Sequence, residues 1–426
     1  MSFSKHLDVA LLPEVDRSVP RLCRRPRQGA ALLFLFWLAL CSCQSGVGSI
    51  LCHDGNGAFD SQFRTGVTVH VGAARERGPT TLATRACAAK LGWEEQEQLV
   101  ATDASQLDLD AFGVDFGDGV PTAAFQIKKS DTDCCVEYRI YSLEKPPRLR
   151  RTITGGGFFS ASDTDLDGRI EIWTNDSAAV NGLENLTLRE LDSAPTIVLR
   201  FEHTQLMDVS AEFQPYFDGE IARIRSEIRE QDLQDFKSSD GKLTETSSIS
   251  PERLHQLRPV KIKVLEIIWA YLYSGREQEA WHSLADMWPS ADSDRVRVAL
   301  RDARANGIHH QADGMSLGTP PRKKKQAHVF DAVSQSKPSN KVEVIPPKAI
   351  LLQRPQLSNI HRRGQPLLLD LIVDEAGKVR SADPAGKEKW ADPQLINAAL
   401  AWKFIPAFKD GRAVASRVRI AVSPRQ

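Results

Sequence analysis

Short apolar runs separated by turn residues dominate the chain between residues 44 and 205. Runs of strand length occupy residues 67–71, 123–128, 136–143, 170–173 and 196–201. Clusters of Gly, Asp and Pro lie between them, and these residues favour turns over extended strands. The pattern therefore predicts a β-rich domain over residues 44–205.

The spacing of apolar residues becomes helical after residue 206. Ile221, Ile224 and Ile228 recur at helical intervals, while charged residues cover the other faces. Between residues 260 and 305 the pattern predicts three helices, separated by the Ser274-Gly275 turn and by Pro289. We therefore expect a helical region over residues 206–312.

One part of this region resembles a tetratricopeptide-type helical hairpin. The resemblance rests on small and aromatic residues at Ala270, Tyr271, Gly275, Ala280 and Trp281. A single unit of this kind cannot bury its apolar face alone, so it must pack against a neighbouring element. A peptide-binding groove and a helical adaptor are the two interpretations.

The end of the chain, residues 346–426, predicts a small ββαβ domain. An apolar run at 367–373 is followed by turn residues and a return strand at 378–381. Asp392-Pro393 has the N-cap and first-position chemistry that begins a helix, and 414–422 is a last strand. A polar segment over 313–345 is expected to be a flexible linker before this domain.

Three motifs in this region occur in a fixed order. They are Val373-Asp-Glu-Ala-Gly-Lys-Val379, Trp402-Lys-Phe-Ile-Pro-Ala407 and Gly411-Arg-Ala-Val414. Together they resemble the C-terminal domain of TonB-type energy transducers. The Tyr-Pro pair that usually opens that domain is Arg354-Pro355 here, and Pro366 removes a backbone donor at the start of the first strand. A generic ββαβ domain is the alternative.

The resemblance implies a protein partner, such as an outer-membrane receptor, and a link to transport across the cell envelope. In the family, the domain adds an extended receptor peptide to a sheet edge, where main-chain hydrogen bonds give affinity. The corresponding edge here is the last strand, with Val414, Val418 and Ile420 as its candidate partner-binding residues.

The N-terminal 43 residues have the features of an export signal. Arginines between Arg21 and Arg27 precede an apolar run over 30–40, which is too short to span a membrane comfortably. The exit Leu40-Cys-Ser-Cys43 resembles a bacterial lipobox with Cys43 as the lipidated residue. An ordinary cleaved signal and an uncleaved anchor are the alternatives. Each predicts location in the periplasm or at the membrane of the cell envelope.

Composition narrows the function further. The chain has 55 Lys and Arg against 55 Asp and Glu, so it lacks the basic footprint of a nucleic-acid binder. After Cys43, four cysteines remain, and an oxidising compartment would allow disulfides among them: Cys52, Cys87, Cys134 and Cys135. Because a bond between adjacent cysteines is strained, we expect Cys134 and Cys135 to find different partners, or one to stay free.

A candidate metal site lies at Asp163-Thr-Asp-Leu-Asp-Gly-Arg-Ile-Glu171. Carboxylates occupy loop positions 1, 3, 5 and 9, and Gly168 permits a sharp turn: Asp163, Asp165, Asp167 and Glu171. Calcium takes six to eight oxygen ligands, which such a loop can provide with backbone and water. The segment resembles the calcium loop of FG-GAP repeats. Asp115-Phe-Gly-Asp-Gly119 is a weaker relative without the carboxylate series. A solvated Asp-Gly turn that binds no calcium is the alternative.

The chain carries no recognisable catalytic motif, and we predict that it is not an enzyme. Gly155-Gly-Gly157 lacks the Lys-Ser or Lys-Thr of a phosphate loop and is expected to connect strands. His309-His310 has no carboxylate or Cys in a ligand register.

The sequence thus predicts a multidomain α+β protein with a β-rich N-terminal domain, a helical middle and a small ββαβ C-terminal domain. We expect an exported, membrane-associated binding protein with a TonB-like domain. The alternative is a calcium-dependent surface adhesion or scaffold protein.

Overall fold

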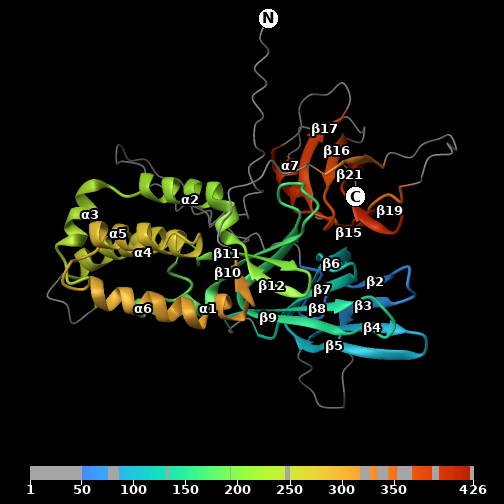
Figure 1. Cartoon of the computed structure of the whole chain (residues 1–426), viewed down its shortest axis with the longest axis horizontal. Helices are drawn as coiled ribbons and strands as arrows, with labels where there is room; N and C mark the ends of the chain where they lie inside the picture. The colour runs from blue at the N-terminus through green and yellow to red at the C-terminus, as the bar shows by residue number, and fades with distance from the viewer. Residues whose placement is uncertain are drawn as a thin grey trace, which may run out of the picture.

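The computed structural model combines β-sheets with seven α-helices in its described parts (Figure 1). It describes residues 50–74, 86–130, 134–191, 193–244, 250–316, 327–332, 344–352, 367–385 and 393–422. The predicted signal segment, with Cys43, lies outside these residues. In Figure 1 the larger helices lie at the left, and the C-terminal elements lie above the sheets at the right.

The largest sheet has nine strands and follows the chain almost in order. Its neighbours are antiparallel except for the last pair, which is parallel. The strands in sheet order are β1 (Cys52–His53), β6 (Gln106–Asp115), β7 (Pro121–Lys128), β8 (Val136–Ser142), β9 (Leu149–Ser162), β10 (Glu171–Asp176), β11 (Thr196–Glu202), β12 (Gln205–Asp208) and β13 (Gly314–Met315). Four of the five predicted strand segments lie in this sheet and are confirmed.

A four-stranded sheet packs against the first part of the large sheet. It consists of β2 (Phe59–Gln62), β3 (Thr68–Ala73), β4 (Cys87–Trp93) and β5 (Gln96–Ala104). Inward-facing Val69 and Leu91 share one apolar core with Phe112 and Phe125 of the large sheet. The alternation of buried and exposed residues along β3 is what lets one face enter this core while the other meets water.

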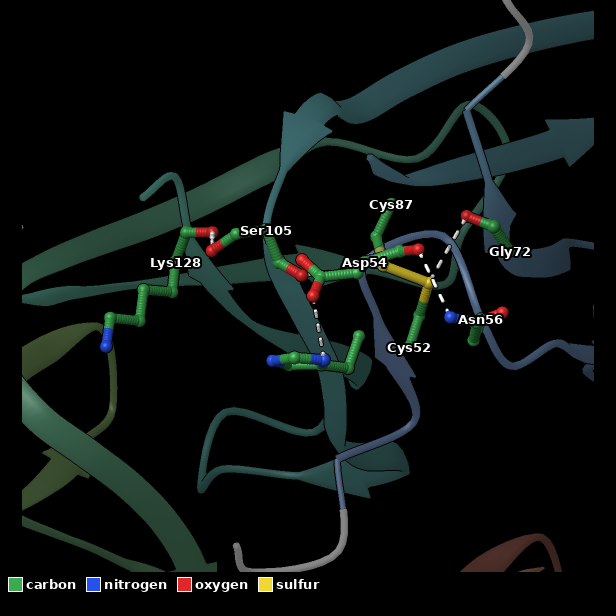
Figure 2. The surroundings of a disulfide bond; sticks show 8 residues. Cys52, Asp54, Asn56, Gly72, Cys87, Ser105 and Lys128 are labelled. Carbon is green, nitrogen blue, oxygen red and sulfur yellow. Dashed lines mark hydrogen bonds and ion pairs between the residues drawn. A yellow bond between two sulfur atoms is a disulfide. The ribbon is translucent and has the colours of Figure 1, made fainter. Parts of the chain in front are cut away.

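The disulfide Cys52–Cys87 joins β1 of the large sheet to β4 of the small one (Figure 2). The Cα atoms are 6.0 Å apart and both cysteines are fully buried. This confirms the prediction of a disulfide. The structure also bonds Cys134 to Cys135, which the sequence analysis did not expect. Because Cys52 and Cys87 are bonded to each other, neither of them pairs with Cys134 or Cys135.

Helices cover the second part of the large sheet. They are α2 (Gln214–Ser226), α3 (Glu230–Lys237), α4 (Pro251–Tyr273), α5 (Glu277–Met287) and α6 (Ser293–Asn306). Short helical pieces are α1 (Ser177–Val180), η1 (Leu183–Asn185), η2 (Ser210–Phe213) and η3 (Ile308–Gln311). Helix α4 begins where the Ser250 side chain accepts a hydrogen bond from Arg253 N. The predicted helices and the Ser274-Gly275 turn between α4 and α5 are confirmed.

One apolar core unites strands and helices in this half of the protein. Ile172 and Leu199 of the sheet share it with Phe217 of α2 and Ile268 of α4. The boundary that the sequence predicted near residue 205 therefore falls inside a common core. The tetratricopeptide-like hairpin buries its apolar face here, against the preceding helices and the sheet.

The C-terminal elements have the predicted order of strand, strand, helix and strand. They are β16 (Leu367–Val373), β17 (Val379–Pro384), α7 (Pro393–Leu400), β18 (Lys403–Ile405), β19 (Ala407–Lys409), β20 (Arg412–Val414) and β21 (Ser416–Val422). The sheet order is β14-β21-β16-β17, and buried Trp402 packs in a separate apolar core with Leu371 and Leu395. The predicted last strand is divided at Ala415, so that β20 forms a hairpin with β19.

The structure contradicts one expectation about loops, at Gly155-Gly-Gly157, and describes only parts of the predicted linker, residues 313–316, 327–332 and 344–345. The described parts of the predicted linker contribute backbone hydrogen bonds: β13 pairs with β12, and β14 (Phe330–Asp331) pairs with β21. In the C-terminal part, β15 (Lys348–Leu351) pairs with β18. Gly155-Gly-Gly157 lies inside β9 and does not form a loop. A Cβ at Gly156 would lie 2.3 Å from Thr174 Oγ1, so a close neighbouring strand explains this glycine.

Candidate metal centre between two turns

The loop between β9 and β10 is shaped by its first aspartate. The Asp163 carboxylate accepts hydrogen bonds from the backbone N–H groups of Asp167 at 2.9 Å and Gly168 at 2.8 Å. Leu166 and Gly168 adopt left-handed backbone conformations, with φ of 55° and 86°. Glycine adopts this conformation without the steric cost that other residues bear, so the sequence favours a sharp turn at Gly168.

Three of the four predicted ligands converge. One carboxylate oxygen from each of Asp163, Asp165 and Glu171 lies within 4.8 Å of the other two. Asp163 and Glu171 are fully buried, whereas Asp165 is exposed. The fourth candidate, Asp167, turns to Arg169 and accepts hydrogen bonds from its Nε at 2.9 Å and Nη2 at 2.6 Å.

Glu171 retains an unused oxygen in this cluster. Its Oε2 accepts a hydrogen bond from Thr164 N at 3.2 Å, but its buried Oε1 has no hydrogen-bond partner. Nη1 of Arg200 lies 3.6 Å from Oε1, so the two buried side chains form an ion pair without a hydrogen bond. The Arg200 guanidinium group donates instead to Glu212, at 2.7 and 3.0 Å, and to Glu202 at 3.0 Å. The guanidinium charge of Arg200 thus partly offsets the cost of burying the Glu171 carboxylate.

The turn between β16 and β17, near the end of the chain, completes the surroundings of the loop. Asp163 N donates to Asp374 Oδ2 at 3.1 Å, and the carboxyl groups of Asp163 and Glu375 share a hydrogen bond. Arg380 Nη2 donates to the carbonyl of Thr164 at 2.8 Å. Oε2 of Glu375 is a second buried oxygen without a hydrogen-bond partner.

Burial and mutual repulsion raise the pKa values of these carboxyl groups. Burial, followed by repulsion from Asp165, raises the pKa of Glu171 to about 8. Burial raises the pKa of Asp374 to about 7, against the attraction of Arg380. Burial also raises the pKa of Asp163, and contact with Glu375 adds to this effect. Burial raises the pKa of Glu375 as well. Without a cation, these carboxyl groups therefore keep their protons to a higher pH than ordinary carboxyl groups do, and an ion that binds there would displace the protons.

Two lysines fix the C-terminal domain beside this cluster. Lys378 Nζ pairs with the Asp110 carboxylate and donates to the Asp110 carbonyl at 2.8 Å, while Lys403 pairs with Asp108. Both aspartates are buried in β6. Asp110 also accepts hydrogen bonds from Tyr138 Oη at 2.7 Å and Ala161 N at 2.8 Å, next to the loop. Burial and the nearby Asp110 raise the pKa of Tyr138.

The chemistry of this junction suits a hard divalent cation. All candidate ligands are carboxylate oxygens, and backbone carbonyls and water can complete the six to eight ligands that calcium takes. The residues present therefore fit the calcium that the loop sequence indicated.

The sequence predicted the Asp163 loop but not the residues of β6 and of the β16–β17 turn that lie beside it. Asp374 and Glu375 had been identified only as turn residues. Asp108 and Asp110 carried a signal, because charged residues inside an apolar strand are rarely buried without a partner. Their lysine partners are separated from them by 295 and 268 residues in sequence, which no local pattern can reveal.

Within the residues that the structure describes, the candidate partner-binding strand is unpaired along part of one side. Within the described residues β14 pairs only with Ser416 and Arg417 of β21. The carbonyls of Ala415 and Arg417 accept hydrogen bonds from this side. Backbone groups alternate in direction, so those of Arg419 and Ala421 face the open edge, whereas Val418 and Ile420 bond toward β16. Val414 lies outside this edge, since it pairs with Ala407 in the β19–β20 hairpin.

The His309-His310 pair was expected to have no carboxylate partner, and the structure differs in this respect. His309 Nδ1 lies 2.9 Å from Oδ2 of buried Asp208, so it does have a carboxylate partner. Asp208 lies at the end of β12, 101 residues earlier in the chain. This contact links η3 to the large sheet, and no further metal-ligating side chain is grouped with it in the described chain.

Compared with known proteins, the chain matches no protein-family model, no curated protein and no solved structure. Within the described residues, no helix combines the length and apolar character needed to cross a membrane.

Proposed function

We propose that this chain is a calcium-dependent scaffold protein of the cell envelope. The observation that carries the proposal is the convergence of Asp163, Asp165 and Glu171 within 4.8 Å at a hairpin between two domains. An ion at this position would stabilise the loop and its surroundings, because a ligand that binds only the folded state adds its binding energy to folding.

Location in the envelope is part of the same proposal. The arginine-rich start, the short apolar run and the lipobox-like Cys43 favour export and a lipid anchor. The buried disulfide Cys52–Cys87 supports an oxidising compartment, where such bonds persist. Extracellular calcium modules commonly bind with Kd values of about 10⁻⁴–10⁻³ M. We expect an affinity in that range.

Direct calcium titration tests the proposal. Isothermal titration calorimetry of the folded protein should detect one site, which Asp165→Asn should weaken by at least about tenfold, since even outer partners of a metal contribute 10–100-fold. Asp165 is exposed, so the substitution leaves the fold intact. Asp115→Asn, in the related loop, should bind calcium like the wild type. The absence of calcium binding to wild-type protein at 10 times the expected Kd, about 10⁻² M, would refute the proposal.

A second candidate function is peptide binding by the TonB-like C-terminal domain. The open backbone groups of Arg419 and Ala421 favour it, because an extended peptide can pair with such an edge. A receptor of the outer membrane is the partner that the resemblance suggests. The exposed guanidinium group of Arg419, although paired with Asp370, would lie beside such a peptide.

Panning of a displayed random-peptide library against the purified protein tests this second function. Peptides that pair with the edge should lose binding to Ala421→Pro, which removes one outward N–H, and keep binding to Ala421→Gly, which retains it. Both variants leave the pairing of β21 with β16 in place, as circular dichroism would check. Equal binding to both variants would exclude edge pairing as the mode of recognition.

A further inference from the structure

An open cleft lies between η1, the turn after α3 and the first turns of α4. Its volume is about 410 Å³, within the range of about 300–1,000 Å³ that small-molecule sites occupy. None of its described lining residues belongs to the candidate metal centre, so the cleft is a separate feature of the helical part. The lining residues include Asn185, Lys242, Leu243, Leu254, His255 and Arg258.

The cleft is lined by basic side chains without a matching acid. Lys242, His255 and Arg258 are basic, and among the described lining residues none is acidic. The Lys242 ammonium group and the His255 imidazole have no hydrogen-bond or ion-pair partner among the residues that the structure describes. Arg258 Nη2 pairs with Glu190 at 2.6 Å and donates to the Asn185 carbonyl at 2.9 Å. Its Nε is buried and has no hydrogen-bond partner in the described chain, so the cleft offers unused donors to an anion.

Two leucines give the cleft an apolar part. Leu243 is 4% exposed and belongs to the large apolar core that joins the helices to the sheet, and Leu254 packs against the same core. Because burial of apolar surface favours binding, a ligand with an apolar group gains affinity by covering these leucines. The lining thus matches a molecule that carries an anionic group on an apolar body.

The walls of the cleft are held in unusual backbone conformations. Asn185 and Leu243 lie in the left-handed region, with φ of 58° and 52°, which is uncommon for residues other than glycine. Such conformations cost energy and cluster at binding and catalytic sites. Buried Lys261 fixes both walls, because its Nζ donates to the Lys242 carbonyl and to Glu184 Oε2, each at 3.0 Å. The cleft is therefore formed before a ligand arrives, which lowers the cost of binding.

We propose that this cleft binds a small phosphate ester, a function separate from calcium binding. The phosphate group lies against the three basic side chains, and the apolar group of the ester covers the two leucines. A phosphate group has three strong acceptor oxygens, so it can engage an arginine fork, a lysine ammonium group and a histidine together. A carboxylate offers only two oxygens, and a single arginine can engage both. A nucleic acid fits less well, because the chain has no net positive charge.

Calorimetric titration of hexyl phosphate into the full chain tests the proposal. One site should appear, with a Kd of about 1 mM or lower, the affinity expected for a ligand of roughly eleven non-hydrogen atoms. Inorganic phosphate and 1-hexanol, which each supply half of the ligand, should bind at least about tenfold more weakly. Hexanoate should also bind more weakly, and equal binding of hexanoate would overturn the assignment to phosphate. If hexyl phosphate does not bind at about 10 mM, ten times the expected Kd, the whole proposal is overturned.

Matched variants test whether the ligand lies in the cleft. Lys242→Gln and His255→Gln each replace an exposed side chain, so both should fold like the wild type, as circular dichroism would check. Both should raise the Kd for hexyl phosphate, Lys242→Gln by at least about tenfold, because hydrogen bonds to charged groups are among the stronger ones. Lys237→Gln, in the last turn of α3, does not line the cleft and should leave the Kd unchanged. Equal Kd values for the wild type and Lys242→Gln would overturn the proposal, whatever the calcium titration shows.

Discussion

Two aspartate-glycine loops in one sheet have similar sequences and different surroundings. The first, at Asp115, joins β6 to β7, and the second, at Asp163, joins β9 to β10. In the first loop Asp115 Oδ1 accepts hydrogen bonds from three backbone N–H groups, those of Gly117 at 2.8 Å, Asp118 at 3.0 Å and Gly119 at 2.9 Å. Asp115 is exposed, so water can donate the hydrogen bonds that the loop does not give to its carboxylate.

The second loop uses the same backbone device but is enclosed by other acids. Asp163 accepts two backbone hydrogen bonds, and it is fully buried beneath the C-terminal domain. Glu171 from β10 and Glu375 from the β16–β17 turn add carboxylates near Asp163. Among the described residues around the first loop, no carboxylates are grouped in this way. The turn motif is common to both loops, whereas burial and neighbouring acids distinguish a candidate ion site from an ordinary turn.

The ion pairs beside the two loops differ in the same way. Arg150 and Asp118 pair at the first loop with side-chain exposures of 26% and 13%. Lys378 and Asp110 pair near the second with 13% and 1%. Because water screens exposed charges, loss of one member of the buried pair should lower the free energy of unfolding much more than loss of one member of the exposed pair.

The largest effect is therefore expected from Lys378→Met. The substitution keeps the length and apolar stem of the side chain but leaves the Asp110 carboxylate buried without its cation. Removing one member of a buried ion pair costs ~3–5 kcal/mol. Urea unfolding followed by tryptophan fluorescence should show this loss in the transition that includes Trp402. Arg150→Met, at the first loop, should cost less than ~1 kcal/mol. Similar losses for the two variants would mean that burial does not separate the two loops.

An intermediate effect is expected from calcium itself. At a calcium concentration about 100 times the Kd, a single site stabilises the folded state by about 2.7 kcal/mol. Differential scanning calorimetry should therefore show a higher melting temperature in calcium than in chelator. Asp165→Asn should abolish most of this difference, and Asp118→Asn at the first loop should not change it. A calcium response that survives Asp165→Asn would place the ion elsewhere in the molecule.

Local patterns were sufficient for much of the fold. The alternation and length of apolar runs predicted strands such as 136–143, observed as β8 (Val136–Ser142), and helical spacing predicted α4 to α6. These signals are local because each element buries one face, whichever partner covers it. Patterns could not show that β-rich and helical parts share one core, since that depends on which faces meet. They also missed β9 at Gly155-Gly-Gly157, because glycine there accommodates a neighbouring strand.

The candidate site was predictable to the same limited degree. Loop spacing identified Asp163, Asp165 and Glu171 correctly as a convergent group, because odd positions on a tight turn point inward. It also included Asp167, which instead binds Arg169 two residues later. Glu375 gave no signal, since its contact with Asp163 arises only when two domains pack together. Long-range contacts of this kind leave no periodicity in the sequence.

The smallest effect is expected at the first loop, from Asp115→Ala. The substitution removes the acceptor for three backbone N–H groups, but all three hydrogen bonds are in an exposed turn where water can replace the carboxylate. The net contribution of such hydrogen bonds is about 0.5–1.5 kcal/mol, and we expect a loss of about 1 kcal/mol. Thermal unfolding should show this loss equally in calcium and in chelator. Glu171→Gln provides the matched comparison, because it removes one candidate ligand oxygen from the second loop and should reduce the stabilisation that calcium gives. A calcium-dependent loss in Asp115→Ala would show that the first loop also holds an ion, and the distinction between the two loops would then fail.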